Sequence, residues 1–329
     1  RWIDYLFYVS FFPGLVAGPI VRARDFIPQM FRTPVVTRET LGEGLYLIIC
    51  GLLKKSVISD YISVNFVDRI FDNPTLYSGL ENLLGVYGYA LQIYCDFSGY
   101  SDMAIGIALL LGFHFPLNFN APYRATSITD FWRRWHISLS SWIRDYIYIS
   151  LGGNRKGKFR QYVNLIVTML LGGLWHGASL NFIAWGGMHG LALAAHKFFS
   201  QDILHHERGY QSYGLRKFVA IVLTFHFVCF TWIFFRHSSF EAGWAMISRI
   251  FTNFHAELWM QIVSGYKYVL AFMAFGFLTH FLPDSWQETM IGGLRRCNVV
   301  VYALLITAVI YIVIQVKSST IQPFIYFQF

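Results

Sequence analysis

Apolar runs long enough to cross a lipid bilayer recur along the whole chain, and they constrain its fold more than any other feature. A transmembrane helix needs roughly 20 predominantly apolar residues. Of the 329 residues, 55% are hydrophobic and only 13% are charged, whereas about a quarter of the residues of a soluble domain are charged. We therefore expect an all-α, polytopic membrane protein.

The apolar runs predict a series of spans and a single membrane domain over residues 1–329. The candidate spans are residues 4–21, 80–95, 98–115, 162–175, 180–199, 218–235, 266–282 and 299–316. Segments 41–60 and 131–151 mix charges with an apolar face, which is typical of helices at the membrane interface. The first residue is Arg1, without an initiator Met or a signal-peptide pattern. We expect the chain to be truncated at its N-terminus.

The excess of basic residues, a formal charge of +8, gathers in short loops. Loops rich in Lys and Arg are usually cytoplasmic in membrane proteins. The predicted spans put all three basic loops on one side: Arg155, Lys156, Lys158 and Arg160; Arg208, Arg216 and Lys217; Arg295 and Arg296. Since no basic tract interleaved with aromatic residues lies outside the membrane segments, we exclude nucleic acid as a partner.

The stretch LLGGLWHGAS places His176 inside an apolar run. Residues 162–175 are too few to cross about 30 Å of hydrocarbon as a helix, and irregular backbone at membrane depth survives only beside protein or a water-filled cavity. We expect this glycine-rich segment to be broken and to line a cavity. An ionisable residue at that depth is a candidate functional site, although a hydrogen-bonded structural role stays open for His176.

A second histidine lies in the block DFWRRWHISLSSWIRDY. Here aromatic rings and guanidinium groups alternate next to His136. The rings could wall a tunnel while Arg133, Arg134 and Arg144 hold phosphate groups. The alternative is an interfacial helix anchored by Trp and Arg at the lipid headgroups, which accounts for the arginines but not for the histidine.

His189 and His196 are seven residues apart, on one face of a predicted helix. Two such histidines could hold a metal ion with a third ligand. No third ligand is evident from the sequence pattern, and no HExxH motif occurs. We therefore expect no metal at these two histidines.

Two long motifs resemble the membrane-bound O-acyltransferase (MBOAT) superfamily. They are DFWRRWHISLSSWIRDYIYISLGGNR and LLGGLWHGASLNFIAWGGMHG. FPGLVAGPIVR, QIYCDFSGYSDMAIGIALLLGF, NFNAPYRATSITDFW and PFIYFQF fit the same group, so the resemblance covers essentially the whole chain. Within the superfamily the chain is similar to the bacterial alginate O-acetyltransferase type, although the usual N-terminal spans are absent.

The resemblance implies an acetyltransferase built as a bundle of transmembrane, broken and interfacial helices around a central tunnel. It implies that His176 is the catalytic residue and that His136 supports it. We assign substrate binding to six further residues: Trp135, Trp175, Arg133, Arg134, Arg144 and Asn120. A neutral imidazole could take the proton of an attacking hydroxyl, which contributes about 10²- to 10⁴-fold to a rate.

The resemblance also implies partners and a location. The expected donor is acetyl-CoA or another cytoplasmic thioester, with no bound cofactor. The acceptor would be an extracytoplasmic polysaccharide such as alginate, reached with a partner acetyltransferase, and the protein would lie in the bacterial inner membrane as a multi-pass protein.

Two other functions stay open at this point. A D-alanyl-transferring MBOAT of teichoic acid modification would use an acyl-carrier protein as donor. A proton-coupled transporter would use the histidines as a relay, but such a carrier is expected to have two related halves, and none is visible in the sequence.

The basic loops generate a first prediction, which concerns topology. A reporter fused after Lys158 or after Arg296 should report a cytoplasmic location, and one fused after Phe329 an extracytoplasmic location, because the three basic loops share one side. Alkaline phosphatase and green fluorescent protein fusions measure the two cases. A cytoplasmic C-terminus would contradict the predicted number of spans.

Overall fold

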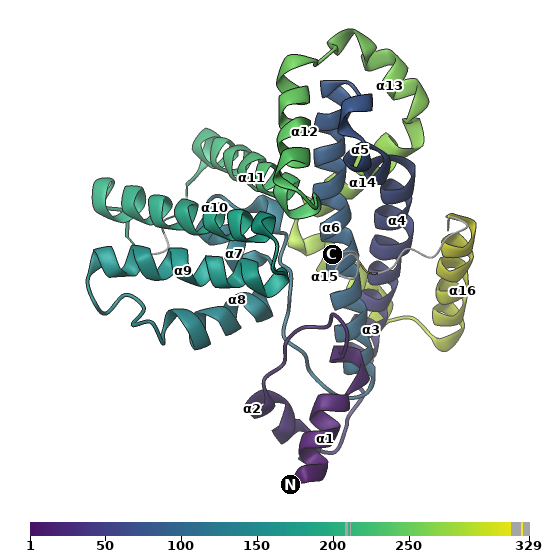
Figure 1. Ribbon diagram of the computed structural model, residues 1–329. Helices are drawn as coiled ribbons and strands as arrows, with labels where there is room; N and C mark the ends of the chain where they lie inside the picture. Colours follow the sequence, from purple (N-terminus) through teal and green to yellow (C-terminus); the bar gives the residue numbers. More distant parts are fainter. Residues whose placement is uncertain (208–209, 211, 317–323, 325–329) are drawn as a thin grey trace. The chain divides into compact units, whose positions relative to one another are not determined.

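The computed structural model describes residues 1–207, 210, 212–316 and 324, and every regular element among them is helical (Figure 1). Arg208 and most of the C-terminal IQPFIYFQF lie outside the described residues. The α-helices are α1 (Trp2–Ser10), α2 (Ala23–Phe26), α3 (Arg38–Leu52), α4 (Asp60–Ile62), α5 (Asp68–Asp72), α6 (Gly79–Leu110), α7 (Ile128–Arg134), α8 (Ile137–Ile143), α9 (Lys158–His176), α10 (Leu180–Lys197), α11 (Gly214–Arg236), α12 (Phe240–Thr252), α13 (Trp259–Gly265), α14 (Lys267–His280), α15 (Asp284–Arg295) and α16 (Val299–Val316). The all-α prediction is confirmed.

The chain divides into two compact units, and α6 contributes residues to both. The first unit contains Arg1–Asn65, Leu91–Phe119 and the described residues from Tyr268 onward, and the second contains Phe66–Ala90 and Asn120–Lys267. Both candidate catalytic histidines belong to the second unit. One domain over residues 1–329 stays a prediction.

In the first unit, α3 and the later part of α6 touch through their backbones. A Cβ atom on Gly51 would lie 2.5 Å from the carbonyl oxygen of Gly99, and one on Gly106 would lie 2.5 Å from that of Gly44. Seven residues separate the two contacts on each helix, so the helices run antiparallel. This close packing brings the Lys54 ammonium to 2.7 Å from the carboxylate of Asp102.

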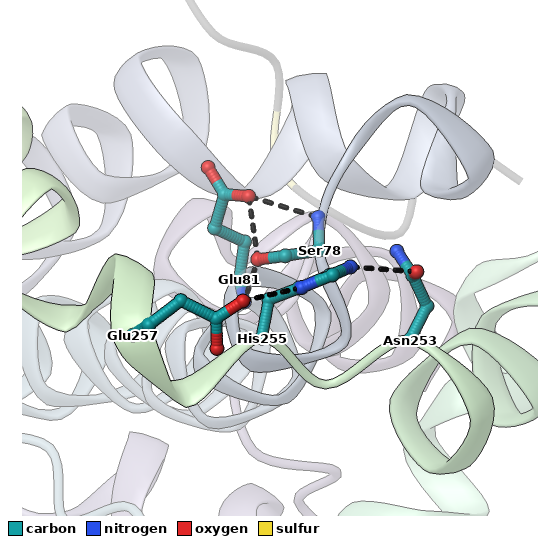
Figure 2. A network of polar contacts seen from close by, with 5 residues as sticks. All are labelled: Ser78, Glu81, Asn253, His255 and Glu257. Carbon is teal, nitrogen blue, oxygen red and sulfur yellow. Dashed lines mark hydrogen bonds and ion pairs between the residues drawn. The ribbon is translucent and has the colours of Figure 1, made fainter.

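The beginning of α6 lies in the second unit and is closed by a capping box (Figure 2). The amide of Ser78 donates to the Glu81 carboxylate at 2.9 Å, and the amide of Glu81 donates to the Ser78 hydroxyl at 3.2 Å. The carbonyl of Asn253 accepts from the amide of Gly79 at 2.6 Å. The loop after α12 therefore satisfies amides that a helix N-terminus would leave unpaired.

The same loop is held by His255, whose ring bridges two neighbours. Its Nδ1 lies 2.6 Å from the Glu257 carboxylate and its Nε2 lies 2.8 Å from Oδ1 of Asn253, as Figure 2 shows. His255 adopts a left-handed backbone with φ of 53°. These bonds fix the turn that leads from α12 towards α13.

In the second unit, α9 and α10 form a helical hairpin and run side by side (Figure 1). A Cβ atom on Gly173 would lie 2.2 Å from the carbonyl oxygen of Phe182, and one on Gly186 would lie 2.3 Å from that of Met169. The two backbones are therefore in direct contact. Glycine is required at these positions because any side chain would separate the helices.

This contact corrects the prediction that LLGGLWHGAS is a broken segment. α9 is helical without interruption from Lys158 to His176 and ends only at Gly177, where φ is 158°. Its glycines do not break the helix because they provide the surface against which α10 packs. α9 is also longer than the predicted span 162–175, since it begins four residues earlier.

Several predicted spans match helices, and others do not. Two described helices are long and apolar enough to cross a membrane by themselves, α11 and α16, and α13 with α14 forms a broken pair that could be a third span. The predicted spans 80–95 and 98–115 are wrong as separate elements, because the single helix α6 covers the first and continues through the second as far as Leu110. Asp96 lies between the two predicted spans, within the helix, and its carboxylate pairs with Lys55 at 2.5 Å. The predicted span 4–21 ends at Ser10 as a helix, because Pro13 follows.

The hairpin generates a second prediction. Gly173→Ala should destabilise the protein by about 1–3 kcal/mol, because the new methyl group has to displace backbone atoms of α10. Gly172→Ala is the matched control, since a Cβ atom there meets only Cδ1 of Ile143 at 3.5 Å, and alanine favours the helix. Melting temperatures in detergent compare the two variants. Equal melting temperatures for the two variants would show that α9 and α10 can move apart without loss of stability.

Candidate active site

His176 is the last residue of α9 and lies beside aromatic rings from three helices. The imidazole centroid is 5.2 Å from the ring of Trp185 on α10 and 5.1 Å from that of Phe235 on α11. Phe182, one turn before Trp185, is 6.1 Å away. Trp185, Phe235 and Phe182 are all buried. We call these three rings the aromatic wall; they hold His176 on one side.

Trp175 lies against His176 with its ring 5.0 Å away, and it is 55% exposed. The same ring is 6.3 Å from that of His136. The structure therefore brings the two candidate histidines, 40 residues apart in sequence, to a single tryptophan. Because Trp175 is open to the surroundings, a substrate could reach this place.

His136 separates α7 from α8 and has a left-handed backbone, with φ of 43° and ψ of 55°. Few residues other than glycine adopt this conformation, although histidine is enriched among them. Its side chain is 4% exposed. Burial, with a smaller contribution from the nearby His176, lowers the pKa of His136 to about 3. The ring is therefore a neutral hydrogen-bonding group at physiological pH.

Hydrogen bonds attach α7 to α10 through the other two histidines of the sequence analysis. The indole Nε1 of Trp132 donates to Nδ1 of His189 at 3.2 Å, and Nε2 of His189 lies 3.0 Å from the Thr231 hydroxyl. His196 pairs with the hydroxyl of Thr129 at 3.0 Å. Within the described chain, no cluster of three His, Cys, Asp or Glu side chains is arranged to hold a metal.

The predicted substrate residues of α7 differ in their surroundings. Arg134 pairs with Asp130 at 2.9 Å and its guanidinium donates to the carbonyl of Asn120 at 3.3 Å. The amide of Asn120 in turn donates to the carbonyl of Arg134 at 2.9 Å. The contacts between Arg134 and Asn120 therefore connect the segment that precedes α7 to the C-terminal end of that helix. Arg133, on the same helix, is exposed.

Arg144 follows α8 at the start of a π-helical segment, Arg144–Tyr148. Its side chain is 63% exposed, and its guanidinium pairs with the carboxylate of Asp145 at 2.7 Å. An exposed pair of this kind contributes little to stability. Arg144 could therefore exchange Asp145 for a phosphate group at small cost.

Trp135 belongs to a buried layer of rings and not to the exposed side of the site. It is 2% exposed, and its ring lies 5.6 Å from that of Phe131 and 5.1 Å from that of Trp232. Trp232 in turn stacks on Trp185 at 5.8 Å. Trp135 thus supports the aromatic wall through Trp232.

Sequence reasoning missed the residues that fix α11 beside the hairpin. Asn181 donates from its side-chain amide to the carbonyl of His237 at 2.6 Å. Arg236 pairs with Asp68 of α5 at 3.2 Å. Arg236 and His237 directly follow Phe235, so these contacts hold that ring against His176. One sequence feature could have revealed this contact: Arg236 is a single arginine at the end of a long apolar run, and such a residue suggests a buried or interfacial partner.

Comparison with known proteins identifies the family of the chain. The model of the MBOAT, membrane-bound O-acyltransferase, family matches residues 2–205. The probable alginate O-acetylase AlgI of Pseudomonas putida is 38% identical over 347 residues, which cover 99% of this chain and 69% of that protein. The peptidoglycan O-acetyltransferase of Helicobacter pylori is 43% identical over 245 residues, 74% of this chain and 45% of that protein.

A relative with a different acyl group also matches. The teichoic acid D-alanyltransferase of Bacillus subtilis is 33% identical over 247 residues, which cover 72% of this chain and 62% of that protein. The chain spans between about half and two thirds of the length of these three relatives. With a family match that includes α7 to α10, where both candidate histidines lie, the chain belongs to the membrane-bound O-acyltransferase family.

Proposed function

We propose that this protein is an O-acetyltransferase that moves an acetyl group from a cytoplasmic thioester, acetyl-CoA, towards a hydroxyl group of an extracytoplasmic polysaccharide. The observation that carries the proposal is the convergence of His136 and His176 on the exposed Trp175 in an O-acyltransferase fold. The relatives named for O-acetylation share more identity with the chain than the D-alanyltransferase does.

In this proposal His176 is the general base. The acceptor oxygen bonds to the acyl carbon while its proton passes to the imidazole, the carbon–sulphur bond breaks, and the departing thiolate takes the proton from His176. His136, neutral because of its burial, assists by hydrogen bonding and not by charge. Trp175 lies between the two rings and contacts the substrate.

Arginine side chains would provide the donor site. Acetyl-CoA carries phosphate groups, and guanidinium groups bind phosphate strongly. Arg133 and Arg144 are exposed and available for this role, whereas Arg134 is engaged with Asp130 and Asn120. The basic loop at residues 155–160 could add to the attraction or could meet lipid phosphates.

The acceptor, the partner and the location complete the proposal. A bacterial inner membrane would place the basic loops in the cytoplasm with the donor, and a partner acetyltransferase outside would pass acetyl groups to the polymer. Alginate and peptidoglycan are the substrates in the names of the relatives. D-alanyl transfer to teichoic acid is the second candidate, because the Bacillus subtilis enzyme is 33% identical over 72% of this chain.

The third prediction tests His176. His176→Ala should abolish acetyl transfer and leave expression and membrane insertion intact, since removing a neutral imidazole leaves no unpaired charge. His176→Gln keeps bulk and hydrogen bonding but provides no base near neutral pH, so it should be equally inactive. The measurement is the acetyl content of the polysaccharide in cells that lack the native copy, together with the amount of folded protein in detergent.

Substantial acetylation by His176→Gln would assign His176 a hydrogen-bonding role and make His136 the leading catalytic candidate. Incorporation of D-alanine in place of acetate in these cells would favour the second candidate function.

The fourth prediction concerns the donor. Arg144→Ala should raise the KM for acetyl-CoA roughly three- to tenfold, about 0.7–1.4 kcal/mol, with a smaller change in kcat, because it removes uniform binding. Arg134→Ala is the contrasting variant and should reduce the amount of folded protein, since it removes the ion pair with Asp130 and the hydrogen bond to the carbonyl of Asn120. Initial rates in membrane vesicles with labelled acetyl-CoA measure both. An unchanged KM for Arg144→Ala would exclude Arg144 from the donor site.

A further inference from the structure

The aromatic layer behind His176 contains indole N–H groups in two different states. The indole of Trp132 is paired, since it donates to His189. The indole nitrogens of Trp185 and Trp232 are buried and have no hydrogen-bond partner among the described residues. Both side chains are 1% exposed. A buried donor without an acceptor is costly in a folded protein, and such a group often has a functional role.

The position of Trp185 indicates what that role is. Its ring lies 5.2 Å from that of His176 and almost perpendicular to it, at 89°. It is rigidly placed: Gly186, the next residue, is in contact with the backbone of α9, and the ring packs on His189 at 4.9 Å and on Trp232 at 5.8 Å. A fixed donor in a dry environment beside a general base is what acyl transfer uses to stabilise a developing oxyanion.

We propose that the indole N–H of Trp185 donates a hydrogen bond to the carbonyl oxygen of the acyl group during transfer, an inference that rests on the proposed function. When the acceptor oxygen bonds to the acyl carbon, the carbonyl electron pair moves onto its oxygen, and the Trp185 N–H stabilises that charge. As the carbon–sulphur bond breaks, the carbonyl re-forms and the thiolate takes the proton from His176. The N–H itself is neither lost nor gained.

Burial makes this donor effective. A hydrogen bond to a charged oxygen is stronger when water is excluded, and a donor that is already held in place requires no reorganisation as the charge develops. Substrate binding would open access to this donor by displacing Phe182, the most exposed ring of the aromatic wall, while Trp185 stays in place. The oxygen of the acyl carbonyl thus provides the hydrogen-bond acceptor that the Trp185 N–H lacks among the described residues.

The chain supplies matched controls for a test. Trp185→Phe removes the donor and keeps an aromatic ring against His176. Trp232→Phe removes a donor that is equally buried and equally unpaired, but whose ring packs on Trp185 and Phe235 behind the wall. Trp132→Phe removes a paired donor and leaves Nδ1 of His189 without its partner.

The experiment uses the full-length protein in membrane vesicles with acetyl-labelled acetyl-CoA, and it measures kcat, the KM for acetyl-CoA and the melting temperature in detergent. Trp185→Phe should lower kcat roughly 10²- to 10³-fold with little change in KM. Trp232→Phe should keep kcat within about threefold of the original. Both should lose a similar amount of thermal stability, and Trp132→Phe should lose more, because it alone breaks a hydrogen bond.

Equal kcat values for Trp185→Phe and Trp232→Phe would overturn the inference and assign the Trp185 indole to packing. If Trp185→Phe does not fold, β-(3-benzothienyl)alanine at position 185 keeps the bicyclic shape, replaces N–H by sulphur and gives the same comparison. His176→Ala separates the two proposals: an active His176→Ala contradicts the proposed function, whereas an inactive His176→Ala with a fully active Trp185→Phe contradicts only the role of Trp185.

Discussion

Direct contact between the backbones of α9 and α10 is the constraint on which the histidine site depends. Gly173 and Gly186 leave no room for a side chain on either helix. With the two axes this close, Phe182 and Trp185, one turn apart on α10, lie beside His176 at the end of α9. The position of the aromatic wall beside His176 follows from that approach, and a wider hairpin would move the wall away from it.

Paired polar groups then fix the neighbouring helices in the second unit. His189 joins Trp132 of α7 to Thr231 of α11, Asn181 bonds to the carbonyl that follows α11, and Arg236 reaches α5. Burying any of these polar groups without its partner would cost free energy. An arrangement of the helices that separates a pair is therefore disfavoured. Apolar packing by itself tolerates alternative arrangements more readily. The polar contacts therefore give the site its precise geometry.

The sequence predicted the helical class and the family, because these depend on composition and on long motifs, whereas the catalytic roles of His136 and His176 stay predictions. It did not predict that α9 is unbroken, since a glycine pair is compatible with a break and with close helix packing, and only the partner helix distinguishes them. The ion pair between Arg134 and Asp130 could have been inferred from the sequence, because the two residues are four positions apart and share one face of a helix. The aromatic wall could not, because Phe235 comes from a helix distant in sequence and periodicity does not reveal which helices meet.

The two histidines are not equivalent, and their backbones explain why. His136 occupies a left-handed turn between α7 and α8 and is buried, which keeps its ring neutral and fixed. His176 ends a regular helix beside the exposed Trp175, where a substrate can arrive. Strained backbone persists only where the surroundings determine it. The strain at His136 is thus consistent with the assisting role proposed for its ring, and the position of His176 is consistent with its proposed role as general base.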